Sequence, residues 1–180
     1  GVTEIHPYAF HGCYSINYVH FPSTLKSIRS YAFCTNYALR EIRLPEGLEW
    51  LEDRVFQDCY AVEKVNLPES LTRVNGYIFH HCRNLRHINI PRSWTSIPNG
   101  LCYCCYSLES IEIPENITYI GDEAFYECYR LTEVRFHADI ATIRSGSFRY
   151  CRAMRDYYCY RTTPPSLTSS NVFNDIPGSC

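Results

Sequence analysis

The sequence lacks the features that mark several large functional classes. Its net charge is only −2, whereas a dedicated nucleic-acid binder normally carries a strongly basic face. No run approaches the roughly 18 apolar residues of a membrane span, and no basic start leads into an apolar stretch of the signal-peptide type. There is no phosphate-binding loop, no H-E-x-x-H and no G-x-S-x-G. We therefore expect no nucleic-acid partner, no membrane insertion, no cofactor and no enzymatic activity.

Cysteine and tyrosine, in contrast, are abundant. The chain of 180 residues contains 11 cysteines and 16 tyrosines, and 46% of its residues are hydrophobic. This length predicts a single folded domain. Many cysteines in a short secreted chain would indicate a disulfide framework, so their spacing has to be considered before that interpretation is accepted.

A repeat of 23 residues runs through the chain without an insertion. Phe10, Phe33, Phe56 and Phe79 are each 23 residues apart, and the same step then reaches Cys102, Phe125 and Phe148. Apolar residues recur at fixed distances before and after this column. They are Ile5, Ile28, Leu51, Val74, Ile97, Ile120 and Ile143 five residues before it, and Val19, Ile42, Val65, Ile88, Ile111, Val134 and Tyr157 nine residues after it. Such periodicity is typical of repeat architectures in which each unit stacks on the next.

Each repeat predicts one short strand and one turn. Ile42-Arg43-Leu44 alternates apolar and polar residues, which indicates a strand with one buried face. The proline that follows, as at Pro45, lacks an N–H and ends the strand. The Tyr31-Ala32-Phe33 segment is too short for a long helix and predicts a turn or a 3₁₀ piece on the outer side. Seven stacked repeats would form a solenoid with a parallel strand ladder about 30 Å long.

Most of the cysteines belong to the repeat. Three residues after the aromatic column stand Cys13, Asn36, Cys59, Cys82, Cys105, Cys128 and Cys151. A small polar group there can bond main-chain groups of its own and adjacent turns. Asn36 cannot form a disulfide, so its presence in this column favours buried reduced thiols, although some disulfides or a metal remain as alternatives.

These residues resemble a known family. The segment Gly121-Asp122-Glu123-Ala124-Phe125-Tyr126-Glu127-Cys128 is similar to the BspA-like leucine-rich repeat, typified by I-G-x-x-A-F-x-x-C-x-x-L-x-x-I-x-L-P. The resemblance implies a leucine-rich-repeat solenoid over residues 1–160 and a capping segment over residues 161–180, which stops before the further strand that relatives add. It also implies a bacterial cell-surface or secreted protein that binds host proteins, matrix or other cells. The sequence departs from the family at the position after the ladder cysteine, which is usually small and polar in relatives.

Two surfaces are candidate binding sites. Outward positions of the predicted strands vary between turns and form the first candidate: Tyr18, His20, Glu41, Arg43, Lys64, Asn66, His87, Asn89, Glu112, Glu133 and Arg135. The position after the ladder cysteine forms the second, an aromatic face: Tyr14, Tyr37, Tyr60, Tyr106 and Tyr129, with arginine at 83 and 152. Tyrosine and arginine are favoured at protein interfaces, and a tyrosine ladder could bind sugar rings. Alternatively, the strand face is only a solvated, salt-bridged surface, and the tyrosines only pack on one another.

One group of residues resembles a catalytic or metal site in its residue types. Stacked repeats would bring Asp58, His81 and Cys104 together, which imitates an orienting carboxylate, a base and a nucleophile. With His80 it also imitates a metal site. The outer side of a solenoid offers no deep pocket and no oxyanion donors, so we predict neither catalysis nor a metal there.

The sequence therefore favours a non-enzymatic module that binds a protein ligand, namely a host or cell-surface protein, through the strand face. The alternatives are a glycan bound on the tyrosine ladder and a structural spacer that displays another domain.

Overall fold

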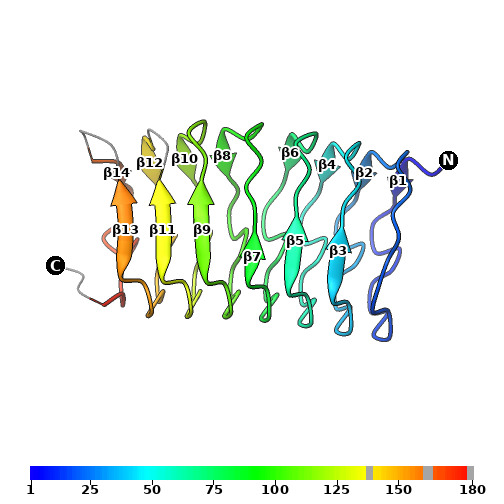
Figure 1. Cartoon of the computed structure of the whole chain (residues 1–180), viewed down its shortest axis with the longest axis horizontal. Helices are drawn as coiled ribbons and strands as arrows, with labels where there is room; N and C mark the ends of the chain where they lie inside the picture. Colours follow the sequence, from blue (N-terminus) through cyan, green and yellow to red (C-terminus); the bar gives the residue numbers. More distant parts are fainter. Residues whose placement is uncertain (137–139, 160–163, 178–180) are drawn as a thin grey trace.

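The computed structural model describes residues 1–136, 140–159 and 164–177, and of the side chains of 156–159 nothing is stated. The chain winds into a single coil whose turns follow one another from end to end (Figure 1). We number the 23-residue turns from the N-terminus, so that turn 1 comprises residues 1–23, turn 4 residues 70–92 and turn 5 residues 93–115. The predicted solenoid of parallel strands is confirmed. No helix in the described part of the chain is long and apolar enough to cross a membrane.

The predicted strand is present in turns 2 to 7. These strands are β3 (Glu41–Arg43), β5 (Lys64–Asn66), β7 (His87–Ile88), β9 (Ser110–Ile113), β11 (Glu133–Phe136) and β13 (Asp156–Cys159). All their pairings are parallel and in register, so that Ile42 lies beside Val65 and Val134 beside Ile111. The bridge between Tyr18 and Glu41 extends the ladder to turn 1. We call the solvent side of this ladder the strand face.

A second strand in each turn corrects the expectation of one strand per repeat. It is formed by β1 (Glu4–Ile5), β2 (Ser27–Ile28), β4 (Trp50–Leu51), β6 (Arg73–Val74), β8 (Ser96–Ile97), β10 (Tyr119–Ile120), β12 (Thr142–Ile143) and β14 (Ser166–Leu167). Two residues are too few for an alternating pattern, so sequence alone gave no signal of a strand. Their backbone groups are extended and lie opposite equivalent groups of the next turn, which is sufficient for parallel pairing.

The aromatic segment forms turns, as predicted, and not a 3₁₀ helix. Its backbone places a residue with positive φ at two positions of each turn, for example Tyr31 (58°) and Thr35 (61°) in turn 2. Between them, alternate N–H groups point at the following turn: Tyr31 donates to the carbonyl of Asp53 (3.1 Å) and Phe33 to that of Val55 (2.9 Å). The outer side therefore carries a third ladder of inter-turn hydrogen bonds. Those bonds offset the cost of the left-handed conformations.

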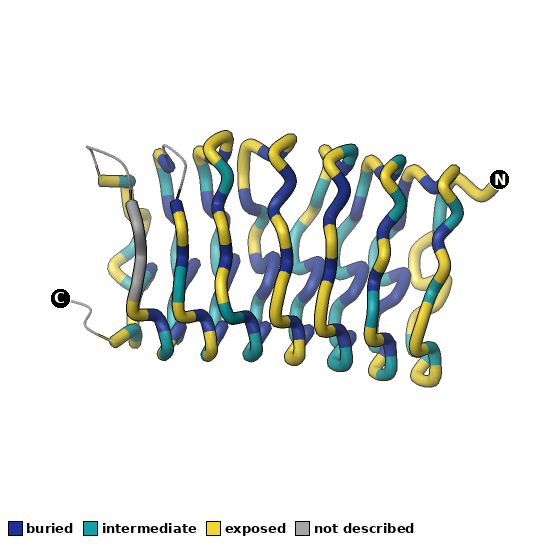
Figure 2. The backbone as a smooth tube through the Cα atoms, in the orientation of Figure 1, coloured by how far each residue is buried: buried dark blue, intermediate teal, exposed yellow. Residues whose placement is uncertain are grey.

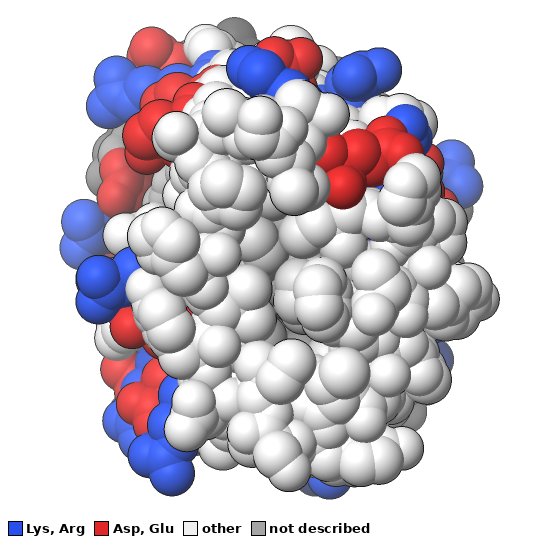
Figure 3. Space-filling model, turned by 90° about the vertical axis from the view of Figure 1, so that its right-hand side faces the viewer, with Lys and Arg blue, Asp and Glu red and all other residues white. Residues whose placement is uncertain are grey.

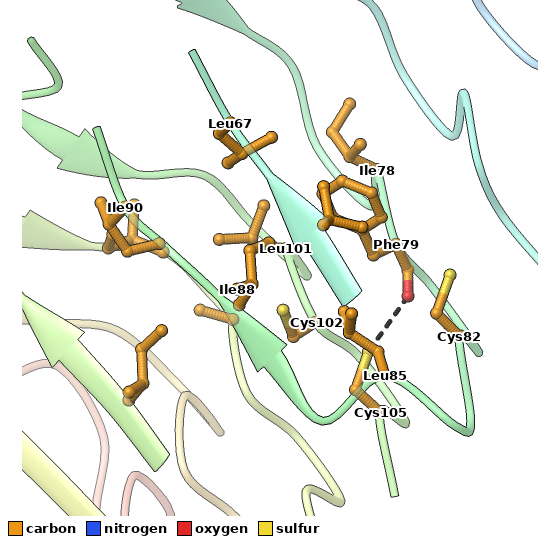
Figure 4. Packing of buried hydrophobic residues seen from close by; sticks show 14 of the residues in the cluster. Leu67, Ile78, Phe79, Cys82, Leu85, Ile88, Ile90, Leu101, Cys102 and Cys105 are labelled. Atoms are coloured by element: carbon orange, nitrogen blue, oxygen red, sulfur yellow. Dashed lines mark hydrogen bonds between the residues drawn. The ribbon is translucent and has the colours of Figure 1, made fainter. Parts of the chain in front are cut away.

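The core is a column of similar layers, shown by the buried positions that recur from turn 2 onward in Figure 2. Phe33, Phe56 and Phe79 are fully buried and stack with ring centroids 5.6 and 5.8 Å apart. Beside them the leucine, isoleucine and valine columns fill the interior. Figure 4 shows this packing around Phe79, with Leu85 and Ile88 from one turn and Leu101 and Cys102 from the next. Because no turn can bury these side chains alone, the stack itself supplies the hydrophobic stabilisation.

The two ends of the coil differ. At the C-terminal end, Phe173 stacks on Phe148 at 5.6 Å, and Phe148 donates its N–H to the carbonyl of Val172. At the N-terminal end, Val2, Tyr8, Phe10 and Tyr14 are exposed, and Figure 3 shows there a broad surface without charged side chains. In the same view, charged side chains gather along the left edge, which is the side of the strand face.

Candidate functional site: the strand face and the tyrosine ladder

The strand face presents the side chains that the sequence predicted. Inward positions such as Ile42, Val65 and Val134 are buried, while the outward positions beside them point to solvent. Nine of the eleven predicted residues are exposed, and Glu41 and Glu133 are half-buried. The face is therefore an accessible surface fixed on hydrogen-bonded strands.

Ion pairs organise part of this face. Arg43 Nε donates to Glu41 Oε1 at 2.6 Å, and Arg135 makes the equivalent contact with Glu133. The pair with Glu41 raises the pKa of Arg43, and hydrogen bonding is the main cause. Exposed pairs of this kind contribute little stability.

The aromatic face forms a continuous stack. Tyr14, Tyr37 and Tyr60 lie with ring centroids 5.2 and 4.8 Å apart and nearly parallel planes. The Arg83 guanidinium then lies over Tyr60 at 4.6 Å, and Tyr106 stacks on Tyr129 at 4.9 Å. Each internal ring therefore covers the face of its neighbour, and mainly ring edges meet the solvent.

The cysteine column bonds the main chain, as predicted. Cys59, Cys82, Cys105 and Cys151 each donate the thiol to the carbonyl of the aromatic residue of the preceding turn at 3.2 Å, and Cys128 donates to that of Cys102 at 3.3 Å. Figure 4 shows the bond from Cys105 to Phe79. Asn36 does the same with its amide, which donates to the carbonyls of Phe10 (2.8 Å) and Phe33 (2.7 Å).

The described cysteines, from Cys13 to Cys151, are free thiols. Burial raises the pKa of the Cys82, Cys105 and Cys128 thiols well above its usual value and that of Cys34 to about 11. Neutral thiols are poor nucleophiles and poor metal ligands, so the column is suited to structure.

Asp58 and His81 meet as the stacking predicted, but Cys104 is turned to another partner. His81 Nδ1 lies 3.0 Å from Asp58 Oδ1, whereas the Cys104 thiol donates to Glu127 Oε2 at 3.4 Å. Burial raises the pKa of Cys104 to about 12, which disfavours the thiolate that nucleophilic catalysis requires. Within residues 1–136, 140–159 and 164–177, no three His, Cys, Asp or Glu side chains converge as a metal site.

Sequence reasoning missed a clamp on the outer side. Tyr77 in turn 4 reaches across turn 5 and donates its hydroxyl to Glu123 Oε2 in turn 6 at 3.1 Å. Gly100 makes room for this ring, because a Cβ there would lie 2.2 Å from Tyr77 Cδ1. The glycine alone was a weak signal, because the same column also holds Gly146, although larger residues such as Tyr31 and Glu123 occupy it elsewhere.

Sequence reasoning also missed a groove on the strand face. It has a volume of about 730 Å³ and lies over β5, β7 and β9, where the ladder is interrupted. Of the predicted residues, Asn66, His87, Asn89 and Glu112 line it. The remaining predicted residues of the strand face lie outside the groove.

Comparisons with known proteins agree with this architecture. The family model of the BspA type leucine rich repeat region matches the chain in six copies, over residues 1–101 and 35–155. A search of curated proteins gives no match.

Several solved structures share the fold. A leucine-rich repeat protein from Eubacterium ventriosum is 23% identical, with a TM-score of 0.78 over 86% of this chain and 41% of its own. The leucine rich repeat protein of T. pallidum is 26% identical, with a TM-score of 0.70 over 74% and 62% of the two chains. A leucine rich cell surface protein from Faecalibacterium prausnitzii is 22% identical, with a TM-score of 0.62 over 97% and 61%. The chain thus spans between 41% and 62% of the length of these structures.

The family model covers most of the repeat array, and the column of stacked phenylalanines and hydrogen-bonded cysteines gives the match its physical basis. The chain therefore belongs to the BspA-type leucine-rich repeat family.

Proposed function

We propose that this chain is a non-enzymatic recognition or adhesion module that binds a protein partner through its strand face, as part of a bacterial cell-surface or secreted protein. The family supports a binding role, and the likeness to a leucine rich cell surface protein from Faecalibacterium prausnitzii supports the cell surface. The partner we expect is a host protein or a protein of another cell surface.

One observation carries the proposal: the strand face combines a repetitive scaffold with a non-repetitive surface. The buried columns are nearly identical from turn to turn, whereas the outward positions change from Arg43 to Asn66 to Glu112. The main chain of paired strands is already ordered and loses little freedom on binding, which favours affinity. Their charges and polar groups supply complementarity to a particular partner.

The tyrosine ladder gives weaker support to the alternative of glycan binding. A sugar ring stacks on the face of an aromatic ring, and the rings of Tyr37 and Tyr60 cover each other at 4.8 Å. Tyr14, at the end of the stack, is 59% exposed. The geometry favours mutual packing for the internal rings.

The experiment compares capture of purified extracellular proteins on an array with binding to a glycan array, both probed with the labelled chain. The variant Arg43→Glu/Arg135→Glu reverses two charges on the strand face. The control Lys26→Glu/Arg130→Glu makes the same change in charge at two exposed positions away from it. We expect the first variant to weaken protein capture about tenfold or more and the control to leave it nearly unchanged.

Equal capture by the strand-face variant and the control would reject the strand face as the binding surface. Binding confined to the glycan array, and lost in Tyr14→Ser/Tyr37→Ser, would replace the proposal with the alternative.

A further inference from the structure

Both strand ladders are interrupted at the same junction, between turns 4 and 5. On the strand face, the pairing β3-β5-β7 ends at β7, and a separate sheet begins at β9; on the other side, β6 ends one sheet and β8 begins the next. The outer ladder continues across the junction, since Tyr77 and Phe79 donate to the carbonyls of Asn99 and Leu101. On the strand face, Glu109 still donates its N–H to the carbonyl of Arg86 at 3.3 Å just before the strands. β7 and β9 themselves are not paired, and Figure 1 shows a wider spacing between them than between their neighbours.

The sequence contains the cause on the far side. At the position after the second strand, Asn75 and Gly121 donate their N–H to the preceding turn, at 3.0 and 2.9 Å. Pro98 occupies this position in turn 5 and has no N–H to donate to Val74. The junction between β6 and β8 therefore lacks a main-chain hydrogen bond that Asn75 and Gly121 make at the equivalent position of their turns.

On the strand face, a side chain takes the place of a strand pair. The amide of Asn89 accepts from the N–H of Leu67 at 2.7 Å and donates to its carbonyl at 2.8 Å. Pairing of β5 with β7 consequently stops at Val65 and Ile88. Beyond that point no further residues of β5 and β7 pair, and the groove of about 730 Å³ opens there.

The groove has an apolar floor and a mainly acidic wall. Ile88, Ile90 and Pro114 contribute to the floor, while the carboxylates of Glu69, Glu112 and Glu115 and a single guanidinium, that of Arg92, provide the charges. Carboxylates outnumber cations, so the groove is complementary to a positively charged ligand. Its volume lies in the range of pockets that enclose a small ligand or a short peptide.

The chemistry of the walls points to an extended basic peptide. The groove runs over β5, β7 and β9, so an extended segment could lie along it and contact several turns through its side chains. Apolar side chains of the segment would meet the floor and its lysine or arginine side chains the carboxylates. Resting on the proposed function, we propose that this groove receives an extended, lysine- or arginine-containing segment of the protein partner.

The direct test uses a short fluorescein-labelled peptide of alternating valine and lysine with blocked ends. The control is the same peptide with glutamate at every lysine position. Fluorescence anisotropy with the full chain should show saturable binding of the lysine peptide, weakened by added salt, and much weaker binding of the glutamate peptide. Absence of saturable binding by the lysine peptide would overturn the proposal, and so would equal binding of both peptides.

Two variants locate the site. Glu112→Gln/Glu115→Gln removes two carboxylates of the groove and keeps their shape, and we expect affinity to fall about tenfold or more. Glu46→Gln/Glu63→Gln removes two exposed carboxylates that lie outside the groove, and should change the affinity little. Equal losses in the two variants would mean diffuse attraction to the whole face and would overturn the proposal.

A third variant tests the shape. Ser110→Tyr places a ring in the groove without a change in charge, and the fold accommodates Tyr18 at the equivalent position of turn 1. We expect it to abolish peptide binding and to leave the thermal unfolding temperature close to that of the parent; retained binding in a folded variant would contradict the groove as the site. Failure of the peptide tests, together with loss of protein capture in Arg43→Glu/Arg135→Glu, would reject the groove while leaving the proposed function standing.

Discussion

Replacing Gly100 with alanine should destabilise the fold far more than the same change at Gly146. The two glycines occupy equivalent positions of turns 5 and 7 and have similar positive φ angles, 56° and 65°. A left-handed alanine costs about 1 kcal/mol at either site. At Gly146 the new Cβ would meet Glu123 Cγ at an ordinary 3.4 Å, whereas at Gly100 it would overlap the ring of Tyr77.

The expected difference follows from the contacts that Tyr77 would lose on moving aside. Its hydroxyl bond to Glu123 contributes about 0.5–1.5 kcal/mol. The Arg54 guanidinium over its ring, at 4.6 Å, contributes about 0.5–1 kcal/mol. We therefore expect Gly100→Ala to lower the free energy of unfolding by about 2–4 kcal/mol and Gly146→Ala by about 1 kcal/mol.

Urea unfolding followed by circular dichroism measures both values. The double variant Tyr77→Ala/Gly100→Ala completes the test, because without the Tyr77 ring the added Cβ has nothing to displace. In the Tyr77→Ala background, the Gly100→Ala change should cost no more than Gly146→Ala. Equal costs of the two glycine changes in the parent chain would refute the clamp.

Three further predictions concern the core, the thiols and pH. Phe79→Ala should lower the free energy of unfolding by about 3–5 kcal/mol. Phe79 is fully buried and stacks on Phe56, and Cys102, which follows Phe79 in the column, cannot fill the cavity. A loss below about 1 kcal/mol in urea unfolding would contradict the stacked column. Iodoacetamide should modify Cys13 in the folded protein and spare Cys82 and Cys105, because burial raises the pKa of the latter two thiols. Unfolding should expose all three thiols, and mass spectrometry of native and denatured samples distinguishes the outcomes. Burial lowers the pKa of His80 from 6.5 to about 4, with His81 and Arg54 contributing. The unfolded chain therefore takes up this proton first, and the free energy of unfolding should fall as pH drops from 6.5 to about 4. The variant His80→Gln should flatten this part of the profile.

Much of the fold followed from the sequence because equivalent residues of a solenoid lie over one another. The 23-residue spacing of Phe33, Phe56 and Phe79 placed their rings in one row, and the structure confirms it. The same rule brought Asp58 to His81 and gave the cysteine column its main-chain partners. The direction of the Cys104 thiol did not follow, since Glu127 of the next turn competes for it.

The interruption at turns 4 and 5 was less accessible to sequence reasoning. Pro98 was visible as a proline outside the expected column, and its missing N–H could have indicated a broken ladder. The role of Asn89 could not be anticipated, because an outward amide is ordinarily solvated on a strand face. Its bonds to Leu67 depend on how far the two turns are separated, which local sequence does not specify.

The sequence by itself determined the coil, its register and its interior. A strict repeat of apolar and small polar residues buries its apolar side chains when each turn stacks on the next. Only the tertiary structure decided where the ladder opens, how Tyr77 spans two turns, and which exposed carboxylates share a groove. Those features arise from contacts between side chains of different turns. The sequence gives the order of these residues along the coil but not the distances between their side chains.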